Sequence, residues 1–399
     1  MKISQRAQAI APFLAMEFGK HATALEAAGH RVIRLNLGEP DFGAPPAVRA
    51  ELQRIMAANT PLPYTGALGL PALREAIAAF YQRAHGVTIS PERVVVTAGA
   101  SAALLLLTAA LVDPGDEVLV GDPSYPCNRQ FLSGFGADVR LVPTDAAARF
   151  QLDLAAVQRH WSARTRGLMI ATPSNPTGTS VPPAELAAIC DWAQAHQAWR
   201  IVDEIYLNLS DADAASGQAA QTVLAHDPGA CVINSFSKYF GMTGWRLGWA
   251  VVPDVLAPAM ERLAQNYYIC APTPAQMAAL ACFTPESIAE CEARKQELAE
   301  RRALVLKGLE DIGLPVPVRP DGAFYVYIDV SDTGMDAMRF CQRALDEAQV
   351  ALTPGHDFGV SGAGRYVRLS YAASQDDLRE GIARLARFMA SRQARPLDA

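Results

Sequence analysis

The sequence predicts an α/β fold in which a large domain holds a mostly parallel, doubly wound sheet and a smaller α+β domain completes the chain. Three observations predict it. Short β-branched runs alternate with helical stretches from about position 90 onward, as in βαβ units. The charged segment 286–311 has the composition of a long connecting helix. Two more strand-like runs follow that helix and indicate a second sheet.

The expected strands are short runs that lie between turn residues. Those of the large sheet are 93–97, 117–120, 167–171, 201–203 and 231–234, and those of the smaller domain are 323–330 and 366–370. Amphipathic stretches between them would form the covering helices. The segment 184–197 is an example, because Pro182 and Pro183 suit a helix start.

Composition restricts the class of function. The chain has 399 residues, of which 50% are hydrophobic, and a net charge of -6 that gives no basic face for nucleic acid or anionic lipid. The longest near-apolar run, 102–112, is shorter than the roughly 20 residues of a membrane-spanning helix, and no apolar signal core opens the chain. We therefore expect a cytoplasmic protein that binds small molecules, without nucleic acid or membrane partners.

Seven scattered cysteines without a CxxC pair disfavour structural disulfides and zinc, so no metal is expected. Chemistry is indicated instead by polar residues that follow the predicted strands. Asn175, Asp203 and Lys238 each come at or after the end of a successive strand, at the spacing of βαβ units. Ligands of open α/β sheets bind at this edge, so the three side chains should share one crevice.

The segment 97–101, Thr-Ala-Gly-Ala-Ser, lies between a strand and an apolar helix. Free N–H groups and the positive end of the helix would make it a phosphate-binding turn, although strand–glycine–helix turns are more often purely structural. The segment lacks the lysine of a P-loop and the glycines of a dinucleotide fingerprint. A nucleotide-binding protein is therefore the weaker alternative.

The most specific segment is 235–248, Ser-Phe-Ser-Lys-Tyr-Phe-Gly-Met-Thr-Gly-Trp-Arg-Leu-Gly. It resembles the cofactor-lysine signature of the fold type I, class I and II aminotransferases, the aspartate aminotransferase family. An isolated lysine is nearly always a solvated surface charge. Here Lys238 lies among glycines and aromatic residues, with Arg246 eight positions later, which a solvent-facing helix would not require.

The resemblance extends over nearly the whole chain, from 37–42 and 64–66 to 366–370. It implies a pyridoxal 5'-phosphate-dependent aminotransferase that moves an amino group between an amino acid and a 2-oxo acid by a ping-pong mechanism. It also implies a homodimer with shared active sites. The expected domains are an N-terminal segment of the small domain, 1–45, a large cofactor-binding domain, 46–284, and a connector helix with the C-terminal small domain, 285–399.

The resemblance also implies the catalytic roles. Lys238 would hold the cofactor covalently and, once freed, act as the general base. Asp203 would pair with the pyridine nitrogen and keep it protonated. Tyr206 and Asn175 would contact the phenolic oxygen of the ring, and Tyr125 would stack on the ring.

The remaining roles concern the phosphate and the substrate. Besides the backbone of Ala100, the phosphate would contact Ser101, Ser235 and Arg246, together with Tyr64 from the neighbouring subunit. The substrate's α-carboxylate would bind Arg368, whose planar fork fits that group. Gly38 and Asn175 would complete the substrate contacts.

Substrate preference is less well marked. Ser101 stands where some dicarboxylate-specific relatives have a lysine, and 266–270 supplies no arginine for a distal carboxylate. A neutral or aromatic amino donor is therefore expected. Ile10, Phe13 and Met16 form an apolar stripe that either lines the pocket mouth or, as we expect, packs into the core.

Two further alternatives are weighed against an aminotransferase. A β-eliminating lyase, or another reaction of the same cofactor, shares the ring chemistry and differs only in how the substrate is positioned. A cofactor-sensing transcription regulator would need an N-terminal DNA-binding domain, and the motif at 37–42 begins too early to leave room for one.

Overall fold

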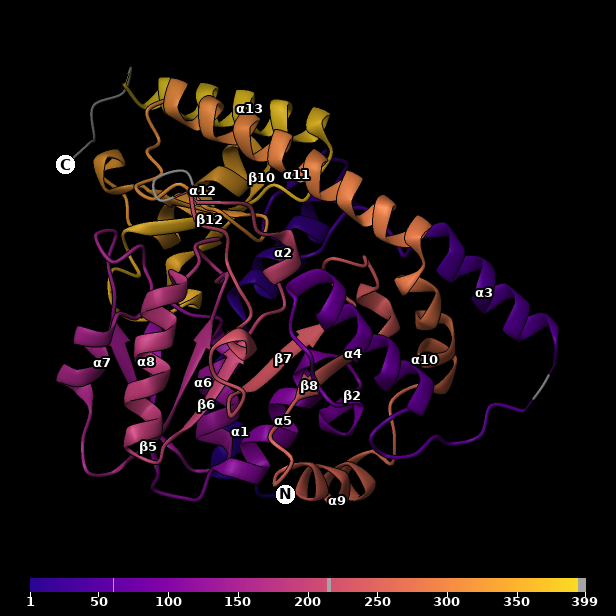
Figure 1. Ribbon diagram of the computed structural model, residues 1–399. Coiled ribbons are helices and arrows are strands. Elements are labelled where there is room, and N and C mark those ends of the chain that lie inside the picture. The colour runs from indigo at the N-terminus through magenta and orange to yellow at the C-terminus, as the bar shows by residue number, and fades with distance from the viewer. Residues whose placement is uncertain (60, 214–216, 394–399) are drawn as a thin grey trace.

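A seven-stranded sheet lies at the centre of the computed structural model, which describes residues 1–59, 61–213 and 217–393 (Figure 1). Its strand order is β2-β8-β7-β6-β5-β3-β4. Neighbours from β7 to β4 run parallel, whereas β8 is antiparallel to both β2 and β7. The strands are β2 Val94–Thr97, β3 Glu117–Asp122, β4 Asp138–Pro143, β5 Thr165–Ala171, β6 Trp199–Asp203, β7 Cys231–Ser235 and β8 Gly248–Val251.

Helices cover both faces of this sheet. Alternate residues of the strands point to opposite sides, and both sets are apolar and buried. One face packs against α5 Ala100–Leu111, α6 Pro126–Gly134 and α9 Ala257–Tyr267, and the other against α4 Pro71–His85, α7 Leu154–His160 and α8 Pro183–Ala195. The predicted doubly wound α/β sheet is therefore confirmed.

Two smaller sheets accompany the central one, and one of them joins the N-terminal and C-terminal parts of the chain. β9 Tyr325–Asp329, β11 Thr353–Pro354 and β12 Tyr366–Ser370 form an antiparallel sheet in the order β11-β12-β9. β1 Ile33–Arg34 pairs in parallel with β10 Val350–Ala351, which brings the N-terminal part of the chain against the C-terminal part. The predicted strands 323–330 and 366–370 are confirmed with small changes at their ends.

The long helix α11 and several shorter helices surround these sheets. α11 Pro285–Asp311 is the predicted connector, and the hydroxyl of Thr284 caps it by accepting the N–H of Ser287. It lies beside α13 Gln375–Gln393 at the top of Figure 1. The remaining α-helices are α1 Gln5–Ala9, α2 Leu14–Ala27, α3 Pro46–Ala57, α10 Thr273–Ala279 and α12 Ala337–Ala348.

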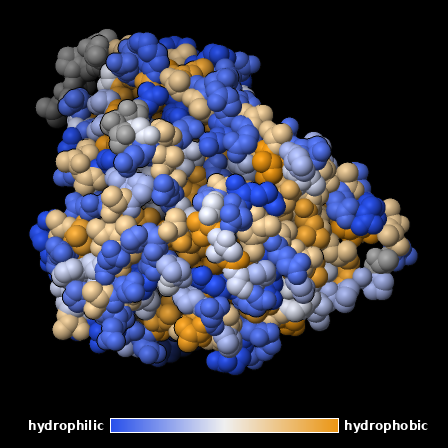
Figure 2. Space-filling view, viewed as in Figure 1, coloured by the Kyte–Doolittle hydropathy of each residue, from blue (hydrophilic) through white to orange (hydrophobic). Residues whose placement is uncertain are grey.

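The surface is mixed in character. The face shown in Figure 2 is mainly hydrophilic, with hydrophobic residues in small groups between the charged ones. Among the residues that the structure describes, no helix combines the length and the apolar composition needed to span a bilayer.

Candidate active site

A cavity of about 230 Å³ opens at the carboxyl ends of the central strands. Its lining contains every predicted site residue except Tyr64, namely Gly38, Ala100, Ser101, Tyr125, Asn175, Asp203, Tyr206, Ser235, Lys238, Arg246 and Arg368. Tyr64 lies outside this lining, and 76% of it is exposed. The crevice predicted for Asn175, Asp203 and Lys238 therefore exists, and segments from both ends of the chain close it.

Lys238 lies in the turn that follows β7. Burial lowers the pKa of its amine to about 8, with the charge of Glu39 partly opposing the change and those of Arg368 and Arg246 adding to it. Its Nζ donates a hydrogen bond to the carbonyl oxygen of Gly38 at 2.5 Å. A buried amine with a lowered pKa is partly unprotonated near neutral pH, which is the state that can act as a nucleophile or a base.

Asp203 ends β6 on the floor of the same cavity. Burial raises the pKa of its carboxyl to about 6, while the N–H of Ile205, which it accepts at 3.1 Å, and the charge of Lys238 oppose the rise. The side chain is therefore mainly ionised at pH 7. The next residue, Glu204, is completely buried and accepts the N–H of Val223 at 2.6 Å.

A group of hydrogen-bond donors that could bind an anion lies where α5 begins. Gly99 has φ +82°, and a Cβ there would lie 2.5 Å from Nη2 of Arg246, so the guanidinium packs directly on this turn. The first residues of α5, Ala100 and Ser101, present helix N-terminal N–H groups to the cavity. Across from them, the hydroxyls of Ser235 and Ser237 are 2.9 Å apart. Donors and a cation thus converge on one point.

Arg368, on β12, is only 2% exposed. Its Nη1 donates to Oδ1 of Asn175 at 2.8 Å and its Nη2 to the carbonyl oxygen of Asn36 at 2.6 Å, whereas its Nε has no partner. Within the described residues, no carboxylate lies within 4.0 Å of this guanidinium. A buried cation without a counter-ion is costly, so the site is built to receive an anion.

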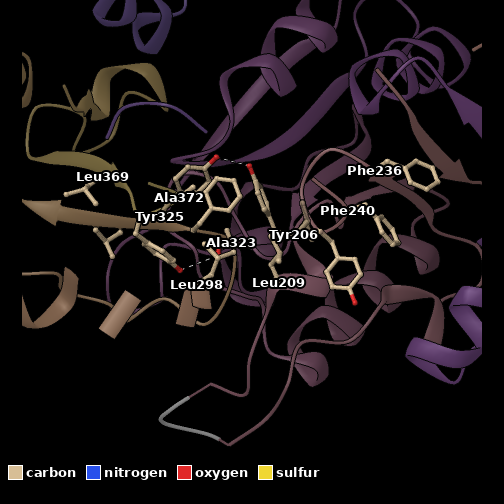
Figure 3. Packing of buried hydrophobic residues seen from close by; sticks show 14 of the residues in the cluster. Tyr206, Leu209, Phe236, Phe240, Leu298, Ala323, Tyr325, Leu369 and Ala372 are labelled. Carbon is tan, nitrogen blue, oxygen red and sulfur yellow. Dashed lines mark hydrogen bonds between the residues drawn. The ribbon is translucent and has the colours of Figure 1, made fainter. Parts of the chain in front are cut away.

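The sequence motifs did not reveal every residue that lines the cavity. Tyr325 is one: its hydroxyl is 2.8 Å from that of Tyr206, as the dashed line in Figure 3 shows. Ser237 was part of the quoted lysine segment but had been given no role. The other unpredicted lining residues come from separate segments and include Ala15, Asn36, Leu37, Leu104, Ala171, Pro173 and Ile205.

The N-terminal apolar stripe corrects one expectation. Phe13 and Met16 line the cavity, whereas Ile10 lies in a neighbouring hollow together with Phe13. Ile10 is 49% exposed and Met16 is 55% exposed, so the expected packing into the core is wrong for these two residues. The reason is that α2 begins only at Leu14, where the carboxylate of Asp357 accepts the N–H groups of Leu14 and Ala15 and holds the segment at the cavity rim.

Comparison with known proteins identifies the family. The model of the family "Aminotransferase class I and II" matches residues 30–385. The chain belongs to this family. Its members depend on pyridoxal 5'-phosphate, so the chain is a pyridoxal phosphate-dependent aminotransferase of fold type I.

Several relatives carry names that describe related reactions. A valine–pyruvate aminotransferase of Mycobacterium tuberculosis is 41% identical over 382 residues, which are 96% of this chain and 97% of that protein. An aspartate/prephenate aminotransferase of Thermus thermophilus is 36% identical and covers 97% of this chain and 98% of its own. The crystal structure of an aminotransferase from M. tuberculosis superposes with a TM-score of 0.94 at 40% identity, covering 98% of this chain and all of that one. None of these relatives is named as a lyase.

The residues of the cavity fit this cofactor. The turn before α5, with Arg246, provides donors for a phosphate dianion, and the floor provides the Asp203 carboxylate for a protonated ring nitrogen. Lys238 provides an amine whose pKa is lowered to about 8. No group of three or more histidine, cysteine or acidic side chains is placed to hold a metal ion in the part of the chain that the structure describes.

Proposed function

We propose that this aminotransferase takes its amino group from a neutral or aromatic amino acid and gives it to a 2-oxo acid. The observation that carries the proposal is the pairing of the buried Arg368, which forms no ion pair among the described residues, with an apolar rim formed by Phe13, Met16 and Leu37 in one cavity. The first would bind the α-carboxylate and the second would receive the side chain.

The carboxylate end is proposed to be held by Arg368, with the backbone of Gly38 and the amide of Asn175 beside it. Asn175 keeps the guanidinium in place through its Oδ1, and the carbonyl oxygen of Asn36 fixes the other end. A bidentate carboxylate would then satisfy the remaining donors, including Nε, which has no partner among the described residues. Binding and orientation of the α-carbon follow from this contact.

Proton transfer is proposed to depend on Lys238. When bound, pyridoxal phosphate supplies an electron sink that makes the α-proton of the amino acid acidic. Lys238 Nζ, with its pKa lowered to about 8, takes that proton and returns one during each half of the exchange. Asp203 would hold a proton on the ring nitrogen, and Tyr206 and Asn175 would contact the ring oxygen. Tyr125 is proposed to lie against the ring face.

The phosphate is proposed to lie on the turn before α5. Its contacts would be the N–H groups of Ala100 and Ser101, the hydroxyl of Ser235 and the guanidinium of Arg246. The positive end of α5 adds to these charges because helix N-terminal N–H groups point to the same place. This anchor would keep the cofactor in the site while its bond to Lys238 is broken and remade.

Selectivity is proposed to come from the rim. The cations that line the cavity, Lys238, Arg246 and Arg368, all have roles in the proposal, so within the described lining none is left to bind a distal carboxylate. The name of the valine–pyruvate relative supports a neutral amino donor with a small 2-oxo acid as acceptor. The name of the aspartate/prephenate relative describes the alternative, an acidic amino donor.

The experiment is a set of single half-reactions. Purified holoenzyme is mixed with one amino acid at a time, and the loss of the visible absorption of the bound cofactor is followed by stopped flow. Valine, leucine and phenylalanine should react with larger second-order rate constants than aspartate, and a 2-oxo acid should restore the colour. A larger rate constant for aspartate than for all three would overturn the proposed selectivity.

We further propose a homodimer in which each active site uses Tyr64 of the partner subunit. The exposure of Tyr64, together with the exposed Leu62, Tyr267 and Ile269, supports an interface on this side of the molecule. Tyr64→Ala and Lys238→Ala chains can be mixed after each proves weakly active or inactive alone. After random exchange, half of the dimers contain one chain of each variant, and one of the two sites in such a dimer is intact. A shared-site dimer should therefore regain about a quarter of wild-type activity. No recovery after verified exchange of subunits would count against the shared site.

The division into domains and the location also stay proposals. A small domain built from 1–45 and 285–399 is supported by the pairing of Ile33 with Val350, and the large domain 46–284 by its own sheet. Limited proteolysis of the apo-protein should then cut near the start of α11 before it cuts within the seven-stranded sheet. The cytoplasmic location remains a prediction from the sequence.

A further inference from the structure

We propose that Tyr325 is a positioning residue that links the carboxylate-binding guanidinium of Arg368 to the hydroxyl of Tyr206. The proposal rests on the function proposed above, because it requires Tyr206 to face the ring oxygen of the cofactor. Tyr325 lines the same cavity, is fully buried, and contacts both partners directly. No motif of the sequence pointed to it.

The first contact is the hydrogen bond between the two tyrosine hydroxyls, 2.8 Å apart (Figure 3). A hydroxyl has a single proton to donate and can accept as well. If Tyr206 donates its proton to the ring oxygen, the proton in its bond with Tyr325 must come from Tyr325. The order of donation is then Tyr325 to Tyr206 to the cofactor, and each bond polarises the next.

The second contact places a cation on the face of the phenol ring. The guanidinium carbon of Arg368 is 4.6 Å from the ring centroid of Tyr325. The register explains why: Ser370 is opposite Tyr325 and Arg368 is opposite Tyr327, so Arg368 and Tyr325 are diagonal neighbours on one face of the sheet. A cation at the ring face makes the phenol a stronger hydrogen-bond donor.

The pKa of Tyr325 reflects these neighbours. Burial raises the pKa of its hydroxyl, and the charge of Arg368 opposes that rise. A carboxylate bound to Arg368 would neutralise this charge and weaken Tyr325 as a donor. Binding of the substrate's carboxylate to Arg368 would therefore weaken the hydrogen bond that Tyr325 donates to Tyr206.

A third neighbour prevents the ring from turning away. A Cβ on Gly38 would lie 2.3 Å from the hydroxyl oxygen of Tyr325, so this hydroxyl abuts the backbone of Gly38. The carbonyl of Gly38 in turn accepts the hydrogen bond of Lys238. The phenol is thus held between Gly38, Tyr206 and Arg368, and only a glycine fits at position 38 without displacing it.

The test uses the visible band of the holoenzyme, whose colour depends on the protonation of the bound cofactor. Its pH midpoint is measured for the wild type, for Tyr325→Phe and for the control Tyr327→Phe. Tyr325→Phe keeps the ring but removes the hydroxyl, so Tyr206 stabilises negative charge on the ring oxygen less well. The midpoint should rise by roughly half a pH unit. Tyr327→Phe removes a buried hydroxyl from the same strand and should leave the midpoint unchanged.

A second measurement adds saturating 3-phenylpropanoate, a carboxylate with no amino or oxo group. This anion should raise the midpoint of the wild type and of Tyr327→Phe, and should raise that of Tyr325→Phe by a smaller amount. Tyr325→Leu, which also removes the ring, should increase KM for the amino acid several-fold, whereas Tyr325→Phe should leave KM within about twofold because the cation–π contact remains.

Two results would overturn the proposal for Tyr325. One is a midpoint for Tyr325→Phe that equals those of the wild type and the control, with and without the carboxylate. The other is an equal rise of KM in the Phe and Leu variants without any spectral change, which is the behaviour of a purely structural residue. Failure of the proposed function looks different: the wild type itself would show no visible band, or no cofactor on Lys238 after borohydride reduction, and Tyr325 would lose its role with it.

Discussion

Replacing Arg368 with methionine should separate binding from stability. The side chain is 2% exposed and carries a positive charge that faces no carboxylate within 4.0 Å among the described residues. Methionine has a similar reach, fills irregular space, and carries no charge. The substitution therefore removes the group proposed to receive the substrate's carboxylate while keeping most of the volume at the base of the cavity.

The magnitude follows from the bonds that the guanidinium would make. Two charge-assisted hydrogen bonds to a carboxylate contribute about 1.5–3 kcal/mol each. Their loss should lower kcat/KM for an amino acid by about 10²–10⁴-fold. Stability has two opposing contributions: relief of a buried, unpaired charge, and loss of the donors to Asn175 and to the carbonyl of Asn36. The free energy of unfolding should therefore change by less than about 2 kcal/mol.

The assay compares valine with valinamide, which lacks the carboxylate, in the half-reaction that bleaches the cofactor. The wild type should strongly prefer valine, and Arg368→Met should lose that preference. Arg365→Met is the control, because Arg365 is 56% exposed, pairs with Asp329 and does not line the cavity. The reasoning would be refuted if Arg368→Met kept the wild-type preference for valine. It would also be refuted if kcat/KM for valine decreased by less than about tenfold.

Three further changes test other parts of the site. Lys238→Ala should leave no reducible link to the cofactor, which mass spectrometry of borohydride-treated protein detects; an adduct elsewhere in the chain would contradict the assignment. Burial raises the pKa of Glu204 to about 8 from 4.5, so the stability that its proton confers is lost as pH rises from about 4.5 to 8. Glu204→Gln should flatten this slope in urea unfolding of the apo-protein between pH 6 and 8, and parallel slopes for both proteins would argue against a buried acid. Ser101→Lys should improve kcat/KM for aspartate relative to valine by about tenfold, and an unchanged ratio would show that position 101 does not read the substrate.

Local patterns were enough to predict most of the large sheet. Buried parallel strands are continuous apolar runs, so 94–97, 167–171 and 231–235 are visible in the sequence. β4 was missed because it is an edge strand with alternating exposure. β8 was missed because Gly248–Val251 returns antiparallel after the lysine turn, and a sequence that suggests βαβ units gives no sign of that reversal.

Within the cavity, contiguous segments made several lining residues predictable at once. The turn at 97–101 and the lysine segment each supply more than one of these residues. Tyr325 was not assigned because it reaches the cavity from the small antiparallel sheet, and its neighbours in sequence are ordinary core residues. Ile10 and Met16 were assigned to the core because apolar spacing does not show which face of a short N-terminal segment is covered.

The pairing of β1 with β10 has a consequence for synthesis on the ribosome. The hydroxyl of Thr353 donates to the carbonyl oxygen of Asn36 across 317 positions of chain, so β1 has no partner until residues 350–353 have been synthesised. The seven-stranded sheet, whose last strand in sequence ends at Val251, can fold before β1 has a partner. Gly38 and Arg368 then meet last, and a nascent chain gains its catalytic pocket only after β12 has left the ribosome.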